Sequence, residues 1–414
     1  MAKVAIFLCF LVAFTANCGK SDISARTQVP GEDGRSRGAA AAGAADPMPQ
    51  PAAYRTEIYV PRLAGERLAL VVNQTSTVGG VHLVDTLQRR GLDLRKIFAP
   101  EHGFRGAADA GATIADGRDV RTGLPIRSLY GKHKQPAAAD LADVDVIVFD
   151  VQDVGARFYT YISTLYYVMA AAAEHGKRVL VLDRPNPNGH VVDGPVREAA
   201  FASFVGIAPV PVLHGLTVGE FARMVNGEGW LPGGARADLS VISMRGYAHD
   251  QTYAPPVPPS PNLPNLRSIY LYPGLCFFEG TAVSVGRGTR RQFQLYGHPA
   301  FTAGDIRFTP APGPGSANPK LNGELCRGFD LSTRPAAAYR TDRLTLDYLL
   351  TGYRQLTAAG QTFFTRPDFF DLLAGTDRLR LDILAGKDEA AIRAGWAAEL
   401  AEYRALRAKY LMYE

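Results

Sequence analysis

Residues 144–155 read VDVIVFDVQDVG and decide the fold class of this chain. A six-residue run rich in β-branched and aromatic side chains leads into a loop with three polar side chains and a glycine. Such a run has the length and composition of a strand buried in a parallel sheet. Similar runs occur at 68–72, 97–99 and 179–182, and helix-like stretches separate several of them. The pattern predicts an α/β fold with a parallel sheet.

Each of these four runs ends in a loop crowded with polar side chains. Ligands of open parallel sheets bind outside the carboxyl ends of the strands, so we expect the four loops to meet at one rim. A fifth short run, at 210–213, predicts another strand that ends in a polar residue. Together these loops supply the candidate site residues Asn73, Glu101, His102, Arg105, Asp150, Gln152, Asp153, Arg184, Asn186, Asn188 and His214.

The chemistry of this set suits acid/base work on a sugar. Carboxylates, amides, arginines and histidines dominate it, whereas no GxGxxG follows a strand and no GxxxxGK[ST], GxSxG or HExxH occurs. The sequence therefore lacks the glycine-rich loop that usually binds the phosphates of a nucleotide. Glycosidic cleavage commonly uses one carboxylic acid to protonate the leaving oxygen and a second group to stabilise or attack the oxocarbenium-like centre.

Glu101 is the first choice for the acid, because it ends a predicted strand and nearby glycines let the backbone approach a ligand closely. Asp150 and Asp153 come next. Asp150 ends the most apolar run of the chain, where a bare charge is costly, so it must be paired, hydrogen-bonded or functional. A helix cap or an ion pair with Arg157 is the structural alternative for Asp150.

Several other candidates also have a structural alternative. Asn186 and Asn188 alternate with prolines and are typical turn residues, although the stiff loop would also suit amides directed toward a sugar. Arg184 and Arg287 are candidates for binding a substrate carboxylate, with ordinary ion pairs as the alternative. His214 is either a ligand-binding or a satisfied structural histidine.

Composition bounds the class of protein. The 414 residues are 47% hydrophobic and 21% charged, the balance of an ordinary soluble protein long enough for two domains. The formal charge of +5 is small, and Lys and Arg are dispersed without a basic run, so the sequence gives no support for a nucleic-acid partner.

Residues 1–18 have the features of an export leader. Lys3 precedes an apolar run from Val4 to Ala16 that is too short to span a bilayer by itself. Cys18 closes the run, as in a bacterial lipoprotein whose cysteine becomes lipidated, and plain secretion is the alternative. Residues 19–53 are rich in Gly, Ala, Pro and Ser, so we expect a disordered tether. The leader predicts an exported protein, periplasmic or outer-membrane-associated through a lipid on Cys18.

A proline-rich stretch at 255–264 cannot form a helix or a central strand, and it predicts a domain boundary. We place the first domain at 54–254 and a smaller second domain at 255–414. Thr217 and Glu220 have capping-box spacing and predict a helix start. Beyond the boundary, the sequence predicts strands at 268–271, 282–285 and 292–295 and helices at 344–359 and 389–409.

Two cysteines, Cys276 and Cys326, follow the leader. They could form one disulfide, yet Cys276 lies in an apolar run and is at least as compatible with a buried free thiol. No CxxC or His-x-x-x-His spacing occurs, so we expect no structural zinc site.

The longer motifs resemble the NamZ-type exo-β-N-acetylmuramidases, a family formerly known only as a domain of unknown function. The resemblance runs from about Arg67 to the C-terminus and rests on long motifs at 73–75, 99–106, 149–161, 182–189, 259–265, 278–281 and 286–289. It implies a Rossmann-like α/β domain, a smaller mixed α+β domain and an active cleft between them. It also implies release of N-acetylmuramic acid from the non-reducing end of peptidoglycan-derived saccharides, as muropeptides or bare disaccharides, without a cofactor or metal.

Glu101 stands at the position of the family's favoured catalytic glutamate, so both lines of reasoning agree there. The second catalytic group stays open among Asp150, Asp153 and Glu279. Two other classes of function also stay open. A non-catalytic peptidoglycan-binding lipoprotein would keep the cleft and its sugar contacts, and a metal-dependent cell-wall hydrolase would use a few of the candidate residues as ligands. Those ligands would be Glu101, His102, Asp150 and His214.

Overall fold

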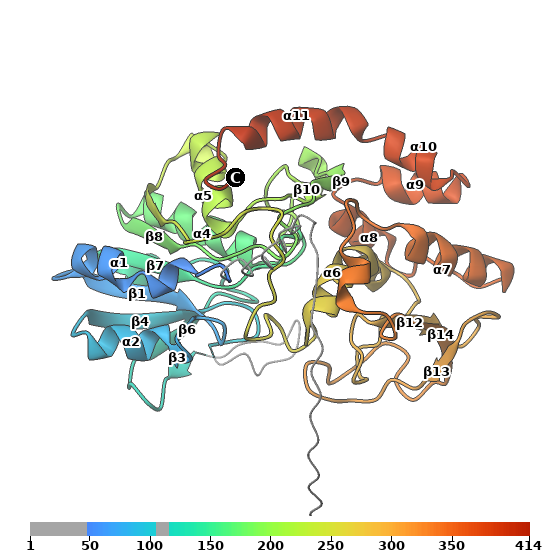
Figure 1. The fold of residues 1–414 in the computed structure, drawn as a ribbon, viewed down its shortest axis with the longest axis horizontal. Coiled ribbons are helices and arrows are strands. Elements are labelled where there is room, and N and C mark those ends of the chain that lie inside the picture. Colours follow the sequence, from blue (N-terminus) through green and yellow to red (C-terminus); the bar gives the residue numbers. More distant parts are fainter. Residues whose placement is uncertain (1–47, 105–115) are drawn as a thin grey trace, which may run out of the picture. The chain divides into compact units, whose positions relative to one another are not determined.

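The computed structural model describes residues 48–104 and 116–414, which belong to one compact unit (Figure 1). The predicted leader with Cys18, most of the predicted tether, and Arg105 lie outside the described residues. Residues 48–53 fall within the range that we predicted as tether, but they pack on the folded domain. The backbone amide of Gln50 donates to the Arg245 carbonyl, and that of Ala52 donates to the Asp183 carbonyl.

A seven-stranded sheet forms the centre of the first part, in the order β11-β8-β7-β1-β4-β6-β5. All neighbours pair in parallel except β5 with β6. The four strands predicted from apolar runs are confirmed and lie side by side at its centre. The strand bounds are β1 Arg67–Val72, β4 Asp93–Ala99, β5 Gly117–Arg118, β6 Pro125–Ser128, β7 Val146–Asp150, β8 Arg178–Leu182 and β11 Asp238–Ile242.

Both faces of this sheet are buried, which explains why its strands read as apolar runs rather than as alternating patterns. In β7, Ile147 and Phe149 belong to one hydrophobic core, while Val146 and Val148 belong to the other. The helices α4 and α5 contribute to the first core, and α1 and α2 contribute to the second. The helix bounds are α1 Thr56–Leu63, α2 Leu83–Arg89, α3 Ala138–Leu141, α4 Tyr161–Glu174 and α5 Val218–Gly227.

The capping box predicted at Thr217 is confirmed. The Thr217 hydroxyl accepts from the Glu220 backbone amide at 3.2 Å, and the Glu220 carboxylate accepts from the Thr217 amide at 2.9 Å. The strand before it, β10 (Pro211–Leu213), lies outside the main sheet because it pairs antiparallel with β9 (Asp193–Val196). A short hairpin of β2 (Thr77–Val78) and β3 (Val81–His82) follows β1.

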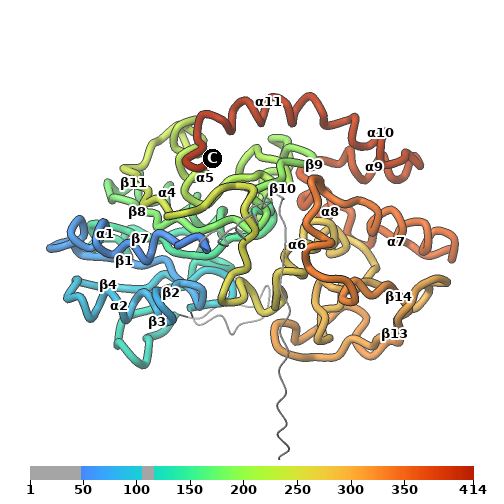
Figure 2. Tube along the Cα trace, in the orientation of Figure 1, coloured from blue at the N-terminus to red at the C-terminus, as the bar shows by residue number. Residues whose placement is uncertain are grey.

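The second part combines a three-stranded antiparallel sheet with helices, in the order β12-β14-β13. Figure 2 follows this part of the chain from yellow to red. Its strands are β12 Leu295–His298, β13 Ile306–Phe308 and β14 Cys326–Asp330, and its helices are α6 Leu266–Leu275, α7 Asp347–Ala358, α8 Pro367–Ala374, α9 Arg378–Leu384, α10 Glu389–Ala394 and α11 Ala397–Ala408. The helices predicted at 344–359 and 389–409 are confirmed, the second with a break between α10 and α11.

The strands predicted in this part are largely wrong. Residues 268–271 lie inside α6, where every residue from 268 to 275 is buried, so no periodicity separates helix from strand. The side chain of Asn265 caps that helix. Residues 282–285 form only an isolated bridge through Ser284, and of residues 292–295 only Leu295 enters a strand. Both cysteines of this part, Cys276 and Cys326, are buried free thiols.

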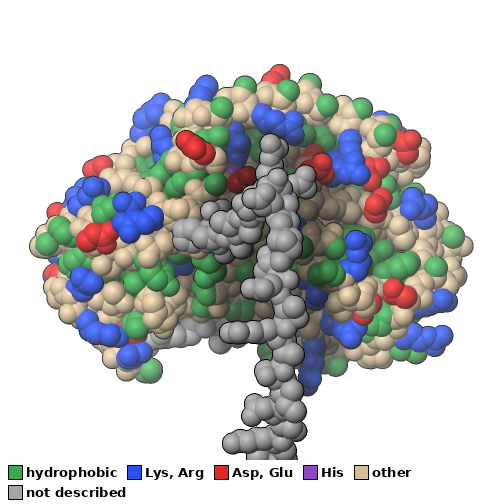
Figure 3. All heavy atoms as spheres, in the orientation of Figure 1, with side chains coloured by type: hydrophobic (Ala, Val, Ile, Leu, Met, Phe, Trp, Pro, Cys, Tyr) green, Lys and Arg blue, Asp and Glu red, His purple; other side chains and the backbone are tan. Residues whose placement is uncertain are grey.

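The end of the chain returns to the first part. Helix α11 leads the C-terminus back beside α5, as the red tube shows (Figure 2). The Tyr403 hydroxyl donates to the His214 carbonyl at 2.8 Å, and the Tyr413 hydroxyl donates to the Asp183 carboxylate at 2.6 Å. The visible face carries Lys, Arg, Asp and Glu in dispersed positions (Figure 3), in agreement with the absence of a basic run in the sequence.

Candidate active site

A cleft of about 710 Å³ receives side chains from both parts of the chain. The first part contributes residues after β4 and β6 and the start of α4. The second part contributes α6 and the turn that follows it, Arg287, the loop between β13 and β14, and α8 with the two residues before it. Three residues singled out in the sequence line this cleft, namely Glu101, Glu279 and Arg287.

Glu101 stands in the turn that follows β4. The backbone amide of Gly103 donates to the Pro100 carbonyl at 3.0 Å, and His102 and Gly103 both have positive φ, at 68° and 77°. A positive φ is uncommon outside glycine, although histidine adopts it more often than most residues, so this turn holds a sparsely populated conformation. His102 itself is buried beside Glu101.

Hydroxyl groups fix the Glu101 carboxylate. The Thr160 hydroxyl, just before α4, donates to Glu101 Oε2 at 2.7 Å. Tyr130, which follows β6, also lines the cleft. Burial, the Glu101 charge and a hydrogen bond to Glu101 raise the pKa of Tyr130, so its hydroxyl stays protonated. The carboxylate is therefore held at the cleft surface by two neighbours from different loops.

The second part of the chain supplies cationic side chains to the cleft. Arg287 Nε donates to Glu279 Oε1 at 2.7 Å, and the Lys320 ammonium donates to the carbonyls of Phe278 and Thr281 at 2.7 and 2.5 Å. Burial raises the pKa of Glu279, but the charges of Arg287, Lys320 and Arg366 outweigh burial and lower it overall. We call Arg287, Lys320 and Arg366 the cationic cluster.

The cationic cluster has more positive charge than its carboxylate can neutralise. Three cations and the two carboxylates Glu101 and Glu279 line the cleft, which leaves a formal excess of one positive charge. Burial lowers the pKa of Lys320 to about 8 despite the nearby Glu279. Arg287 Nη1 is buried and makes no hydrogen bond with any residue that the structure describes. An anionic ligand group would relieve both the charge excess and the unused donor.

Asp150 lies outside this cleft, in the core at the end of β7. Arg184 Nε and Nη2 donate to its two carboxylate oxygens at 2.6 and 2.9 Å, and the two side chains are 0% and 3% exposed. The ordinary ion pair considered for Arg184 is thus present, with Asp150 as its partner. Arg157, the partner considered for Asp150, donates instead to the carbonyls of Pro195, Val210 and Leu373.

Asp153, Gln152 and Asn73 are also buried and do not line the cleft. Burial raises the pKa of Asp153 to about 7, although the amides of Gly155 and Val154 act in the opposite direction. Gln152 donates to the Asp153 and Pro185 carbonyls at 2.8 and 2.7 Å, and the Asn73 carboxamide accepts from Thr75 at 2.9 Å. These contacts fix the strand-end loops against one another.

Asn186, Asn188 and His214 hold neighbouring loops. Asn186 Nδ2 donates to the Leu216 carbonyl, and His214 Nδ1 accepts from the Leu216 amide. Burial, with Arg407 and Arg157, lowers the pKa of His214 to about 3, so the ring is neutral.

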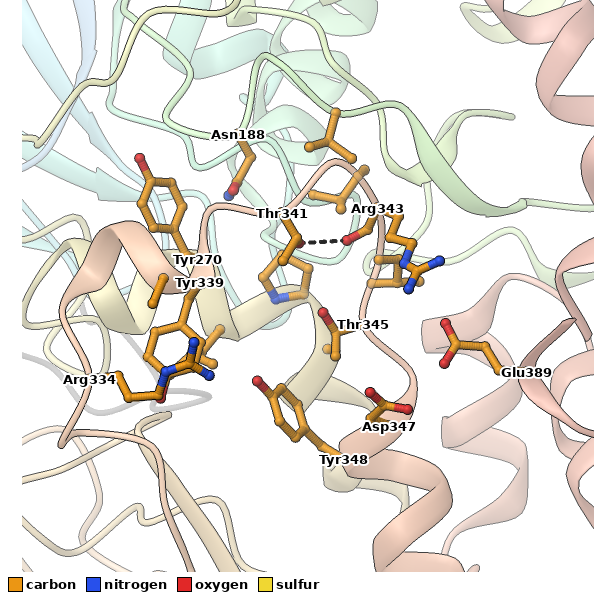
Figure 4. Close-up of a pocket in the computed structure, with 17 residues that line it drawn as sticks. Asn188, Tyr270, Arg334, Tyr339, Thr341, Arg343, Thr345, Asp347, Tyr348 and Glu389 are labelled. Carbon is orange, nitrogen blue, oxygen red and sulfur yellow. Dashed lines mark hydrogen bonds between the residues drawn. The ribbon is translucent and has the colours of Figure 1, made fainter.

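Asn188 Nδ2 donates to the Val154 carbonyl, and Asn188 also lines a second cavity of about 210 Å³ that shares no residue with the first (Figure 4). Figure 4 places Asp347 and Tyr348 across that cavity from Asn188.

Sequence reasoning missed Tyr130, Thr160, Lys320 and Arg366. Tyr130 follows the short strand β6, whose four residues are only half-buried, so the run had no strong apolar signal. Lys320 and Arg366 stand in irregular loops. Neither a strand end nor helical periodicity indicates there which side chain faces a site.

In residues 48–104 and 116–414, no three His, Cys, Asp or Glu side chains gather as a metal site would require. Over the same residues, every helix is too short or too polar to cross a membrane.

Comparison with known proteins identifies relatives along most of the chain. Residues 68–267 match the model of the N-terminal part of exo-β-N-acetylmuramidase NamZ, and residues 270–413 match that of its C-terminal part. The peptidoglycan β-N-acetylmuramidase NamZ of Bacillus subtilis is 37% identical over 380 residues, which cover 86% of this chain and 89% of that protein.

Two crystal structures of DUF1343 family proteins from Bacteroides fragilis are also similar. One is 42% identical with a TM-score of 0.82, and the other is 28% identical with a TM-score of 0.76. Each similarity covers 89% of this chain and 99% of the other protein.

Proposed function

The chain belongs to the NamZ exo-β-N-acetylmuramidase family and is a glycoside hydrolase, and from that premise we propose its substrate and mechanism. We propose that it releases N-acetylmuramic acid from the non-reducing end of peptidoglycan-derived saccharides. One observation supports this proposal above the others. The cleft holds an oriented carboxyl group, Glu101, and a cationic cluster with excess positive charge.

Glu101 acts in this proposal as the general acid that protonates the leaving oxygen. A general acid must keep its proton in a fixed direction toward the glycosidic oxygen, and effective acids contribute about 10² to 10⁴ in rate. Thr160 and Tyr130 supply that orientation from two different loops. The turn at His102 and Gly103 sets the position of the side chain on the rim of the sheet.

The cationic cluster selects the sugar. N-acetylmuramic acid differs from N-acetylglucosamine by a lactyl ether with a carboxylate, and a guanidinium can bind a carboxylate through two parallel hydrogen bonds. Arg287 has an unused buried donor for such a contact. Its guanidinium also lies 4.9 Å from the Phe293 ring centroid, which limits its rotation.

Glu279 is the candidate second carboxylate. Its pKa is lowered by the surrounding cations, so it stays ionised over the neutral pH range. An ionised carboxylate beside the anomeric carbon would stabilise the positive charge that develops there. Of the three carboxylates considered for this role, Glu279 alone lines the cleft, since Asp150 and Asp153 are enclosed in the core.

The place of action follows from the leader. We propose that residues 1–18 direct export and that a lipid on Cys18 retains the enzyme at a membrane, within reach of wall fragments. One lipid chain alone binds a membrane only marginally, so a lipoprotein with several chains is the form that this proposal requires.

A pair of chromogenic glycosides tests the proposed specificity. The enzyme should hydrolyse the β-N-acetylmuramide and reject the matched β-N-acetylglucosaminide, because the latter leaves the cationic cluster without a partner. Arg287→Lys, which keeps the charge but removes the fork of donors, should raise KM for the muramide. Equal hydrolysis of both glycosides by the wild type would contradict this specificity and indicate a general hexosaminidase.

A further inference from the structure

A second group of basic side chains lies near the cleft, apart from the cationic cluster. Residues 131–134 read Gly-Lys-His-Lys and directly follow Tyr130. Lys132 and His133 are exposed, and Lys134 is half-buried. None of these three side chains forms an ion pair with a residue that the structure describes. We call residues 132–134 the basic loop.

Contacts between aromatic rings connect the basic loop to the cleft. The Lys134 ammonium lies 5.0 Å from the Phe204 ring centroid, and the Phe204 ring lies 5.8 Å from that of Tyr130. Phe204 and Tyr130 both line the cleft. The basic loop therefore stands beside a wall of the cleft that two aromatic rings form.

Glu101 connects to the aromatic wall, since its carboxylate is hydrogen-bonded with the Tyr130 hydroxyl. Lys134, Phe204, Tyr130 and Glu101 thus form a connected series from the first part of the chain. The cationic cluster comes from the second part and lines the same cleft. If the cationic cluster binds the released sugar, the aromatic wall receives the leaving group.

We propose that the basic loop binds a carboxylate of the leaving saccharide, beyond the first sugar of that saccharide. This inference rests on the proposed function and deepens it. In a glycan that alternates acidic and neutral sugars, the sugar next to the scissile bond is neutral and the following one carries a lactyl carboxylate. Pockets of roughly 300–1,000 Å³ hold drug-sized ligands, so the cleft of about 710 Å³ has room for more than one sugar. The aromatic rings suit the apolar face of the neutral sugar.

Kinetics with two saccharides tests the basic loop. The disaccharide MurNAc-GlcNAc has a neutral leaving group, whereas the trisaccharide MurNAc-GlcNAc-MurNAc has an acidic one. The wild type should show a lower KM for the trisaccharide, by roughly threefold to tenfold, since two exposed ion pairs contribute little each. In the double variant Lys132→Ala/Lys134→Met that preference should disappear, while the kinetics of the disaccharide stay unchanged. Methionine keeps an apolar stem against Phe204.

A matched control removes the same kind of charge elsewhere. Lys177 stands just before β8, at the amino ends of the strands, so Lys177→Ala should leave the trisaccharide preference intact. Raising the salt concentration should reduce the wild-type preference, because exposed charges are screened. A third saccharide, with an Ala-Glu stem dipeptide on the second muramic acid, distinguishes the source of the carboxylate. If only the saccharide with a free lactyl group has the lower KM, the basic loop binds the carboxylate of the sugar. If the dipeptide-bearing saccharide also has the lower KM, the basic loop can bind a carboxylate of the stem.

Binding measurements separate this inference from the proposed function. Calorimetry on the Glu101→Gln variant, with and without the two lysine substitutions, gives dissociation constants for the same saccharides without turnover. Tighter binding of the trisaccharide that depends on the two lysines would support the basic loop even if no saccharide were hydrolysed. Equal affinities for both saccharides, or a trisaccharide preference that survives in the double variant, would overturn the inference.

Discussion

Replacing Arg184 by methionine should destabilise the protein strongly and leave its chemistry nearly intact. The Asp150 and Arg184 side chains are 0% and 3% exposed, and two hydrogen bonds join them at 2.6 and 2.9 Å. The methionine would leave the Asp150 carboxylate buried without its cation. Removal of one partner from a buried pair costs about 3–5 kcal/mol. That loss is a large part of a typical unfolding free energy of about 5–15 kcal/mol.

Urea unfolding of three variants measures this effect. Arg184→Met should lower the free energy of unfolding by about 3–5 kcal/mol. Asp150→Asn in addition to Arg184→Met should recover part of that loss, because the uncompensated charge is gone. Under conditions where each variant is folded, kcat should stay within about tenfold of the wild type, since neither residue lines the cleft. An Arg184→Met variant as stable as the wild type would refute the reasoning, and so would a folded Asp150→Asn variant without activity.

Three further predictions concern pH, metal and location. Because the pKa of Lys320 is lowered to about 8, its positive charge is present below pH 8 and lost above it. KM of the wild type for an anionic muramide should therefore rise through pH 8. KM of Lys320→Met should change less over the same range. A KM that does not change between pH 7 and 9 would contradict this. Prolonged chelation should leave kcat unchanged, since the proposed reaction uses carboxylates. Loss of activity on chelation and its recovery with added zinc would contradict this mechanism. Fractionation should find the wild type with membranes and Cys18→Ala in the soluble exported pool, whereas a soluble wild type would favour an ordinary signal peptide.

The centre of the fold could be predicted from the sequence because its strands are buried on both faces. Residues 146–150 form β7 with every residue buried, and such a run can be recognised from a single sequence. The same signal failed at residues 268–271, which are also buried but lie in α6. When every residue is buried, the spacing of apolar residues no longer distinguishes a helix from a strand. Only the length of the run and its flanking residues then distinguish the two.

The candidate site could be predicted only in part, because the end of a strand faces either the cleft or the core. Glu101 follows the buried strand β4 and Asp150 ends the buried strand β7, yet only Glu101 lines the cleft, while Asp150 pairs with Arg184. The partner of Asp150 is 34 residues away along the chain, and sequence spacing does not reveal such a pair. Lys320 likewise joins the cationic cluster through the tertiary fold alone, from a loop without periodic structure.

The most direct measurement of the central claim is the turnover of MurNAc-GlcNAc by the Glu101→Gln variant, alongside its affinity for the same disaccharide. Glutamine keeps the shape of the side chain and still accepts the hydrogen bond from Thr160, but it has no proton of suitable acidity to transfer. We predict that kcat falls by about two to four orders of magnitude and that the dissociation constant changes only a few-fold. A folded Glu101→Gln variant with near-normal turnover would contradict the assignment of Glu101 as the general acid.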